Sequence, residues 1–565
     1  MKRHIISAVL ASIMAVSLAG CGAYESSSGT SSSGDVVTAA SGTSGVTATD
    51  SSSASGEKVF RYAESTDPTT LDPDKADSII DNEVIHATQE GLVRNTAGNV
   101  TPGIAESWDV SDDGLTYTFH LRSDAKWSDG VAVTANDFVY GLQRLMDPDT
   151  ASEYAFIGEY IKNGSQVETG AMDPSELGVK ATDDHTLVIT LEQPTSFFLT
   201  LIGGNAAFMP VREDIVDKYG TDFAATADKN VYSGPFVISS TDNGEYVFTK
   251  NENYWDKDNI KLDRAEMMIV ADASTQLAMY EQGELDYVTI PTDSVADYDD
   301  QDEEYMNGNE DFFYINENSD NPILSDKNFR LALNYGLDRN QYIKLATNDV
   351  YTASNTLVMP LVAGYDGKTY GDCYTLDSYP LDGDQDKAQE YLKKAMADNN
   401  ISDPSDISVE ITTTDLDSAK KIAEVCQELW QQSLGIKVTV KQVTYSDIYG
   451  SVLPNGDYEI GFGGWGPDYS DPYTYLNLFK TDCSFNYSNY SNDAFDQLLD
   501  QSQTETDEKT RMDELNKAEQ LLLDDGAFIP LQCRQQHYLL SSKVSGVQFY
   551  FCSVNIDWVY ADISA

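Results

Sequence analysis

Residues 103–148 read GIAESWDVSDDGLTYTFHLRSDAKWSDGVAVTANDFVYGLQRLMDP, a strand pattern followed by a helix pattern. Apolar and polar side chains alternate over 115–121, which is typical of a half-buried strand. Residues 134–146 then begin with a threonine, a good helix N-cap, and place three large apolar side chains at helical spacing from Phe138 onward. We therefore predict a strand and a helix in close succession, as in mixed α/β proteins.

A second unit of this kind lies in the last third of the chain. ISVEITTT at 407–414 predicts a strand, and the next segment, DSAKKIAEVCQELWQQSLG, places its apolar residues on one helix face and ends at Gly435. IKVTV then predicts another strand. Strand, helix and strand in this order form an α/β unit.

The stretch 103–148 resembles the signature of the oligopeptide and dipeptide substrate-binding proteins of bacterial ABC importers. That signature runs from A-E-S-W, through a strand ending in L-R, to K-W-S-D-G and T-A-x-D-F-V-Y, and this chain has each part in order. Further matches are LGVKATDDHTLVITLEQPTSFF (177–198), SGPFVISS (233–240), NENYWD (251–256), NFRLALNYGLDR (328–339), SLGIKV (433–438), GWGPDYSDPYTYLN (464–477) and AEQLLLDDGAFIPL (518–531). The resemblance covers residues 57–565.

The resemblance implies an α/β, two-lobed periplasmic-binding-protein-like fold of type II, with an extra domain inserted in the first lobe. The implied parts are lobe 1 (57–98, 229–315 and 536–565), the inserted domain (99–228) and lobe 2 (316–535). The ligand would lie buried between lobes that close by hinge motion. The length agrees, because one core rarely serves more than about 250–300 residues.

The N-terminus predicts a lipoprotein. MKRH gives a basic start, and the apolar run that follows is too short to span a bilayer as a stable helix. It ends in L-A-G before Cys21, which resembles the bacterial lipobox. We expect residues 1–20 to be a signal peptide and Cys21 to carry the lipid that anchors the protein at the outer, extracytoplasmic face of the cell membrane. Residues 21–56, rich in Ser, Gly and Thr, would be a flexible tether.

The composition argues against nucleic acid as a partner. The chain has 93 acidic and 36 basic residues, a formal net charge of −57, and phosphate binding needs clustered Lys and Arg. Its 34 tyrosines and 6 tryptophans are typical of a folded chain. The six cysteines form no C-x-x-C pair, so no zinc site is predicted, and Cys533 and Cys552 are the candidates for a disulfide. We expect no metal, no cofactor and a monomer.

Residues 461–466 read GFGGWG, which matches the G-x-G-x-x-G of dinucleotide-binding loops. The helix that follows does not start at the third glycine, because residues 467–470 intervene. Asp468 and Asp471 would also face the pyrophosphate, with no Lys or Arg over 459–479 to offset them. We therefore reject the nucleotide interpretation.

The family match assigns a different role to Asp468. In the family, the Asp of the segment matching GWGPDY accepts the α-ammonium of the bound peptide. A buried ammonium must be paired, because an isolated charge in a closed cleft is very costly. The neighbours Trp465 and Tyr469 would supply aromatic walls.

A second match concerns FFYIN at 312–316, which corresponds to the family's strand that hydrogen-bonds the extended peptide backbone. Tyr314 and Asn316 are therefore candidate contacts.

One departure from the family pattern concerns the residues that would bind the other end of the ligand. Relatives that hold peptides of fixed length often have an Arg before the glycine–tryptophan pair, where this chain has Gly463. The peptide length therefore stays open.

The resemblance implies a receptor that binds oligopeptides and delivers them to ABC transporter permease subunits. Other members of the family carry nickel complexes, haem, opines or sugars, so a different solute is the alternative, although the scarce histidines form no H-x-x-x-H pair. A surface peptidase or glycosidase is the alternative in another class. The chain has no H-E-x-x-H and no G-x-S-x-G, and with 93 acids a pair of carboxylates decides nothing. We expect no enzyme activity.

Overall fold

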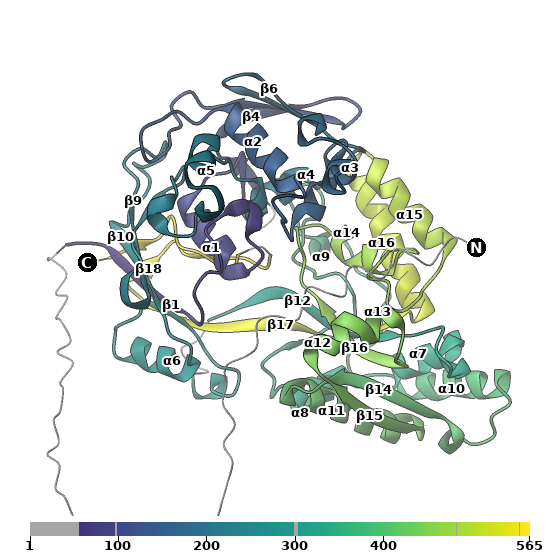
Figure 1. Ribbon diagram of the computed structural model, residues 1–565. Helices are drawn as coiled ribbons and strands as arrows, with labels where there is room; N and C mark the ends of the chain where they lie inside the picture. Colours follow the sequence, from purple (N-terminus) through teal and green to yellow (C-terminus); the bar gives the residue numbers. More distant parts are fainter. Residues whose placement is uncertain (1–55, 97–98, 299–302, 482, 553, 565) are drawn as a thin grey trace, which may run out of the picture. The chain divides into compact units, whose positions relative to one another are not determined.

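The computed structural model describes residues 56–96, 99–298, 303–481, 483–552 and 554–564 (Figure 1). The chain divides into two units, Met1–Ser53 and Ala54–Ala565, and the described residues all belong to the second. The predicted signal peptide, Cys21 and nearly all of the tether lie outside the described residues. Within the described part, no helix combines the length and apolarity that a membrane crossing requires.

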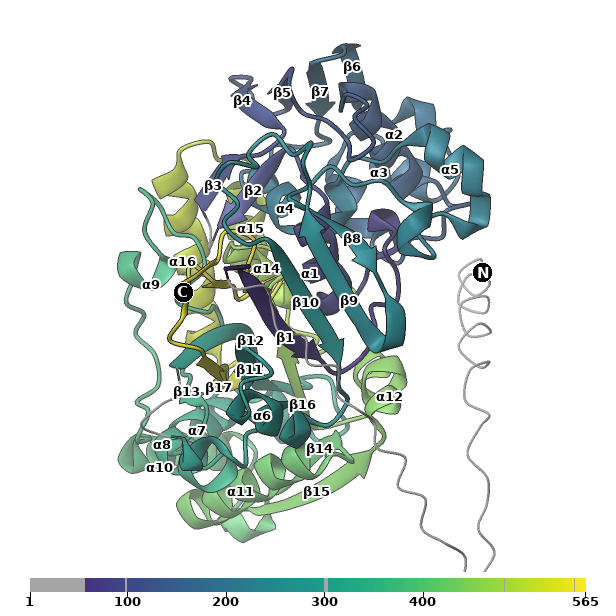
Figure 2. The same cartoon turned by 90° about the vertical axis from the view of Figure 1, so that its left-hand side faces the viewer.

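The first sheet has the strand order β1 (Val59–Glu64), β10 (Arg264–Ile269), β9 (Glu245–Lys250) and β8 (Phe236–Ser240) (Figure 2). β1 is parallel to β10, and the other pairs are antiparallel. Helix α1 (Ile79–Thr88) begins after Ser78, whose side chain accepts a hydrogen bond from the Asp81 amide. The core beside this sheet is centred on Trp558, whose ring packs against Phe60, Tyr62, Phe236 and Phe248. The C-terminal segment therefore completes the core that β1 begins.

The stretch 103–148 forms the predicted strand and helix. The strand is β5 (Thr116–Leu121), in a sheet of order β4 (Ala105–Val110), β5, β7 (Thr186–Thr190) and β6 (Val179–Asp183). The helix is α2 (Ala135–Met146), which begins with a capping box between Thr134 and Asp137. Nearby elements are β2 (Val93–Thr96), β3 (Asn99–Pro102), α3 (Gly164–Glu168), α4 (Phe198–Gly204) and α5 (Glu213–Tyr219). The signature's aromatic residues Trp127, Phe119 and Phe138 are fully buried, so they build the core.

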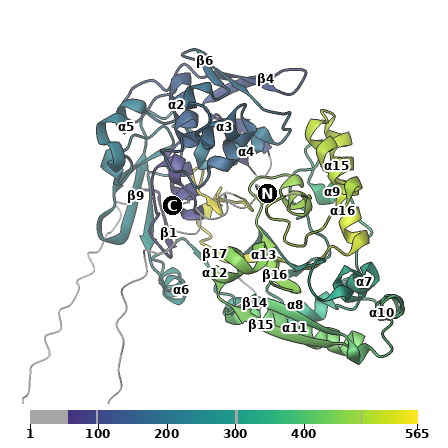
Figure 3. The same cartoon turned by 45° about the vertical axis from the view of Figure 1, so that its right-hand side comes forward.

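The third sheet has the order β11 (Tyr287–Thr289), β17 (Phe528–Leu540), β12 (Glu303–Ile315), β16 (Ile460–Trp465), β14 (Ser408–Thr414) and β15 (Lys437–Val443), and β13 (Thr352–Ala353) pairs with β17. The predicted unit at 407–440 is confirmed, because α11 (Asp417–Leu434) connects the parallel strands β14 and β15 and packs on both. Other helices are α6 (Ala273–Glu281), α7 (Lys327–Tyr335), α8 (Arg339–Ala346), α10 (Gln385–Asp398), α15 (Asp493–Thr504) and α16 (Glu508–Asp525). Figure 3 shows α15 and α16 side by side.

The two longest strands, β12 and β17, have 13 residues each and pair with each other. At one end, Glu303–Met306 pairs with 535–538, close to where β11 joins β17. At the other end, 310–315 lies between β16 and β17. The pairing passes directly from Met306 to Glu310, so residues 307–309 bulge out of the ladder. The predicted lobe boundaries at 315/316 and 535/536 fall at the end of β12 and inside β17, and they stay predictions.

GFGGWG is part of a central strand and does not form a phosphate loop. β16 pairs with β12 on one side and with β14 on the other. A Cβ added to Gly463 would lie 2.5 Å from Cε2 of Tyr314, so the glycine lets a tyrosine ring pack directly on the strand. The predicted helix after it is α14 (Tyr473–Leu476), which continues into a 3-10 turn.

The proposed disulfide between Cys533 and Cys552 is not formed. Cys533 is a buried free thiol on β17. Its neighbours across the ladders are Glu310 and Thr352, so the central strands enclose it.

Candidate functional site

The loop after β16 carries Asp468 and is held in place by Asp471. One carboxylate oxygen of Asp471 accepts a hydrogen bond from the Tyr473 amide, at 2.9 Å. The Arg511 guanidinium donates to both carboxylate oxygens, at 2.7 and 3.0 Å, and both side chains are buried. Arg511 comes from α16, so this ion pair ties the loop to a long helix. Asp471 is therefore a structural residue.

Asp468 itself is half-buried, and no ion pair among the described residues includes it. Its carboxyl is hydrogen-bonded by the side chain of Thr474, which also accepts from the Asp468 amide at 3.4 Å and from Trp465 Nε1 at 3.2 Å. Burial raises the pKa of Asp468 to about 6, and the Thr474 hydrogen bond offsets part of that rise. The carboxyl of Asp468 is therefore partly shielded from water and has no cation beside it among the described residues.

On one side of Asp468 lies a pocket of about 460 Å³, which we call the aromatic pocket. Its walls include Ile157, Tyr160, Trp465, Tyr469 and Phe485. The Tyr469 ring stacks on Phe197, with ring centroids 4.2 Å apart and planes inclined by 3°. The Trp465 ring meets Phe485 edge to face at 5.3 Å. The structure therefore places Trp465, Asp468 and Tyr469 together on one wall.

On its other side, Asp468 borders a smaller pocket of about 170 Å³, which we call the amide pocket. Five asparagines line it: Asn82, Asn205, Asn307, Asn309 and Asn555. The bulge at 307–309 contributes Asn307 and Asn309 to this lining, where β12 leaves its ladder. Carboxamides are suitable partners for the main chain of a peptide.

A third pocket of about 220 Å³ contains a guanidinium, and we call it the arginine pocket. It is lined by Asn309, Asp311, Tyr445, Tyr449, Gly464 and Arg534. Arg534 Nε donates to the buried Asp311 carboxylate at 2.9 Å, while 42% of the Arg534 side chain stays exposed. Sequence reasoning missed Arg534, because a single arginine in a C-terminal strand carries no signal without the register that places it beside Asp311.

Tyr314 and Asn316 lie elsewhere. Tyr314 is buried in the core against Gly463, and Asn316 donates its amide hydrogens to the carbonyls of Gly456 and Tyr458. The main chain of 312–314 has neighbouring strands on both sides, so it offers no free edge to a ligand strand. Both side chains therefore have partners within the protein, and their ligand contacts stay predictions. The backbone outside the ladder belongs instead to the bulge at 307–309.

Comparison with known proteins places the chain in a family of solute-binding proteins. The family model "Bacterial extracellular solute-binding proteins, family 5 Middle" matches residues 99–487. The dipeptide-binding protein DppE of Bacillus subtilis (strain 168) is 31% identical over 500 residues, which cover 88% of this chain and 91% of DppE.

Two solved structures show the fold. Listeria monocytogenes OppA bound to peptide matches with a TM-score of 0.68 and 31% identity, over 90% of this chain and 100% of that chain. The murein tripeptide-binding protein MppA in its unliganded open form matches with a TM-score of 0.77 and 26% identity, over 89% of this chain and 98% of that chain. These likenesses confirm the predicted type II periplasmic-binding-protein-like fold. The chain resembles the open form more closely, although the peptide-bound relative is closer in sequence.

Proposed function

The chain belongs to the bacterial extracellular solute-binding proteins, family 5, and on this premise we propose that it captures oligopeptides between two lobes and delivers them to the permease subunits of an ABC importer. Its peptide-binding relatives support this proposal. The likeness to an unliganded open form supports a further step, in which the pocket walls approach each other when ligand binds.

The observation that carries the proposal is the carboxylate of Asp468. It is half-buried and has no cation among the described residues, and burial has already raised its pKa. A peptide α-ammonium would supply the missing charge and form charge-assisted hydrogen bonds with it. The amide pocket would bind the main-chain amides next to the peptide's amino terminus. The aromatic pocket would offer apolar surface to the ligand on the other side of Asp468.

Arg534 supports a ligand with an anionic end as well. Asn309 lines both the amide pocket and the arginine pocket, so these two pockets are neighbours. A ligand that starts at Asp468 and continues past Asn309 would reach the guanidinium of Arg534. Only its Nε is bonded to Asp311, and 42% of the side chain is exposed, so its outer nitrogens would suit a ligand carboxylate. Arg534 would then take the role of the arginine that relatives carry where this chain has Gly463.

For the N-terminus, we propose that the cell attaches lipid to Cys21 and that the protein stays at the outer face of the cell membrane. The L-A-G-C pattern after a short apolar run supports this. Metabolic labelling with radioactive palmitate tests it: the unaltered protein should carry label and fractionate with membranes. Cys21→Ser should remove the label, whereas Cys373→Ser should not.

Isothermal titration tests the peptide proposal. The protein is freed of bound ligand by unfolding and refolding and is titrated with trialanine and with N-acetyl-trialanine. We expect trialanine to bind and acetylation to weaken binding by about 100-fold, because the cation is lost. Asp468→Asn should weaken trialanine binding similarly, while Asp112→Asn, at an exposed position, should not. Absence of heat with any peptide of a mixed pool would count against peptides as ligands.

Mass spectrometry of the purified protein distinguishes a peptide receptor from a receptor for another solute and from a peptidase. Native mass spectrometry of the untreated protein would give the masses of co-purified peptides or of another solute. Peptides incubated with the protein should stay intact by mass spectrometry, because we propose a receptor and not a peptidase. For a nickel complex, the described residues contain no group of three or more His, Cys, Asp or Glu that could hold a metal ion. Nickel would therefore need to arrive with its own ligands.

A further inference from the structure

A pocket of about 370 Å³ lies between α1, β2 and the C-terminal segment, and the proposed peptide function does not yet use it. Carboxyl groups and aromatic rings share its wall. The residues used below are Glu83, Asp256, Asp557, Trp255, Trp558 and Tyr560. We call it the acidic pocket.

Glu83, on α1, has a carboxyl oxygen without a partner. The side chain is buried, with 5% of the residue exposed. Its Oε1 accepts a hydrogen bond from the Asn555 amide at 3.0 Å, while Oε2 is a buried oxygen with no hydrogen bond from any described residue. Burial and the nearby Glu64 carboxyl hold the pKa of Glu83 well above its usual range. A buried oxygen without a donor on the wall of a pocket marks a position where a ligand donor would be favoured.

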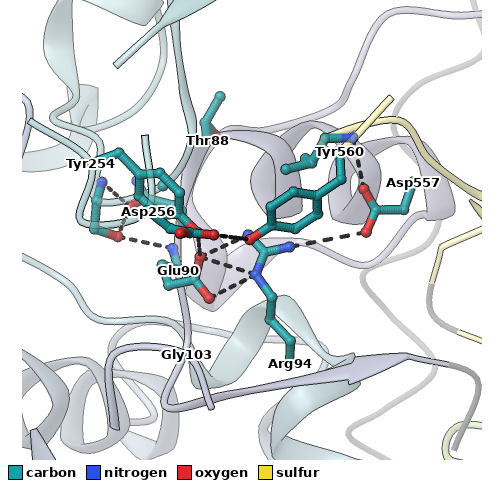
Figure 4. Close-up of polar contacts among 12 residues, drawn as sticks. Thr88, Glu90, Arg94, Gly103, Tyr254, Asp256, Asp557 and Tyr560 are labelled. Carbon is teal, nitrogen blue, oxygen red and sulfur yellow. Dashed lines mark hydrogen bonds and ion pairs between the residues drawn. The ribbon is translucent and has the colours of Figure 1, made fainter. Parts of the chain in front are cut away.

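The guanidinium on this wall, that of Arg94, is already neutralised (Figure 4). Arg94 Nε donates to both carboxylate oxygens of Glu90, at 2.8 and 3.0 Å, and Nη2 donates to the same group at 2.7 Å. The Glu90 side chain is fully buried behind it. On the pocket side, Arg94 Nη1 lies 4.0 Å from Asp557. Arg94 therefore leaves little positive charge for an anionic ligand.

The other titratable groups make the wall negative. Asp256 accepts a hydrogen bond from the Tyr560 hydroxyl at 3.0 Å, and both Asp256 and Asp557 are half-buried (Figure 4). His86 is neutral at pH 7, because burial and Arg94 lower its pKa to about 4. The thiol and the tyrosine hydroxyls on this wall carry no positive charge. Three carboxyls thus face the pocket, and its one guanidinium, among the described residues, is paired with Glu90.

The aromatic rings favour a cation as well. The Arg122 guanidinium already stacks over Trp255, with 3.7 Å from Cζ to the ring centroid. Trp558 and Tyr560 add further ring surface to the wall. Carboxyls together with aromatic rings suit an ammonium or guanidinium on an apolar stem.

The acidic pocket adjoins the amide pocket that borders Asp468. Phe551 and Cys552 line both pockets, and the Asn555 amide that binds Glu83 belongs to another lining residue of the amide pocket. A peptide whose amino terminus is held at Asp468 can therefore place a nearby side chain in the acidic pocket.

From this geometry we infer that the acidic pocket receives a lysine or arginine side chain of the bound peptide and makes the receptor selective for basic peptides. The inference rests on the proposed peptide-binding function. Glu83 is the specificity-determining residue, because its unpartnered oxygen accepts from the ligand cation, and Asp256 and Asp557 add to the negative field around it.

Paired tripeptides test the inference by isothermal titration. The two tripeptides of a pair differ at one position, which is lysine in one and norleucine in the other, and the two remaining positions are alanine. Three such pairs place the lysine or norleucine at each position of the tripeptide in turn. Norleucine keeps the apolar stem and lacks the ammonium. We expect lysine to bind at least about tenfold more tightly than norleucine at one position.

Two variants assign the preference to this pocket. Glu83→Gln and Asp256→Asn should each reduce the ratio of lysine affinity to norleucine affinity at least threefold, whereas Glu176→Gln, at an exposed position, should leave this ratio unchanged. If trialanine binds but lysine and norleucine bind equally at all positions, the inference is overturned while the peptide function stands. If no peptide binds, the peptide function itself fails. A lysine preference that survives both variants would also overturn the assignment.

Discussion

Asp471 and Arg511 form a buried ion pair with two hydrogen bonds, and this pair holds the loop that presents Asp468. The two acidic residues of the loop therefore have different roles. Asp471 has its cation within the protein, and Asp468 has none among the described residues, so it is the one available to a ligand.

The first prediction concerns this ion pair. Asp471→Ala should destabilise the protein by about 3–5 kcal/mol, because it leaves the Arg511 guanidinium buried without its anion. Urea denaturation followed by tryptophan fluorescence measures the change. Breaking the exposed pair of Lys394 and Glu390 with Glu390→Ala should cost less than about 1 kcal/mol. Equal costs for the two variants would show that the buried pair does not hold the loop.

The second prediction concerns the charge of Asp468 in the unliganded protein. The folded-state pKa of about 6 lies above the pKa of an unfolded aspartate, about 3.9. The cost of ionising Asp468 in the folded protein therefore builds up between these two pH values, is complete above pH 6 and is small at pH 4. Asp468→Asn should therefore stabilise the ligand-free protein by about 2 kcal/mol at pH 7.5 and by almost nothing at pH 4. Denaturant titrations at the two pH values measure this, and a gain that persists at pH 4 would refute the electrostatic explanation.

The third prediction concerns the glycines of β16. Gly463→Ala should destabilise the protein by about 1–3 kcal/mol, because the new methyl group meets the Tyr314 ring. Gly450 has no atom within 4 Å of the position of a new Cβ, so Gly450→Ala is the matched control and should be neutral or slightly stabilising. Tyr314→Leu should recover part of the loss in Gly463→Ala, whereas additive losses would place the clash elsewhere.

The sequence predicted those elements whose side-chain pattern records one buried face. The alternation over 115–121 and the helical spacing after Phe138 correspond to β5 and α2, and the capping residues Thr134 and Asp137 mark where α2 begins. YEIGFGGW has the pattern of a strand that runs into glycines, and β16 confirms the strand. The glycines themselves have no side chains whose alternation would mark a buried face. Only the packing of the Tyr314 ring on Gly463 shows why this central strand has a glycine there.

The sequence predicted only those residues of the candidate site that are close together in the chain. Trp465, Asp468 and Tyr469 are close in sequence, so one loop brings them together. Asn82, Asn309 and Asn555 are far apart in the chain and meet Asp468 only through the tertiary fold. No local pattern records such an arrangement. FFYIN has the pattern of a strand, but the pattern does not say that both of its edges are occupied.

The last prediction is the pH dependence of peptide binding. An ammonium ligand needs the ionised form of Asp468, which is about 90% of the unliganded protein at pH 7 and about 10% at pH 5 for a pKa of about 6. The affinity for trialanine should therefore fall about tenfold from pH 7 to pH 5, while the peptide's own amino group stays protonated over this range.

Isothermal titration at several pH values measures this dependence, and trialanine avoids any contribution from the acidic pocket. In Asp468→Asn the remaining weak binding should vary less than about twofold over the same range, because the titrating carboxyl is gone. If the Asn variant keeps the tenfold dependence, another group titrates and Asp468 does not hold the ammonium. If the unaltered protein binds more tightly at pH 5 than at pH 7, the ligand meets the protonated carboxyl as a hydrogen-bond donor instead.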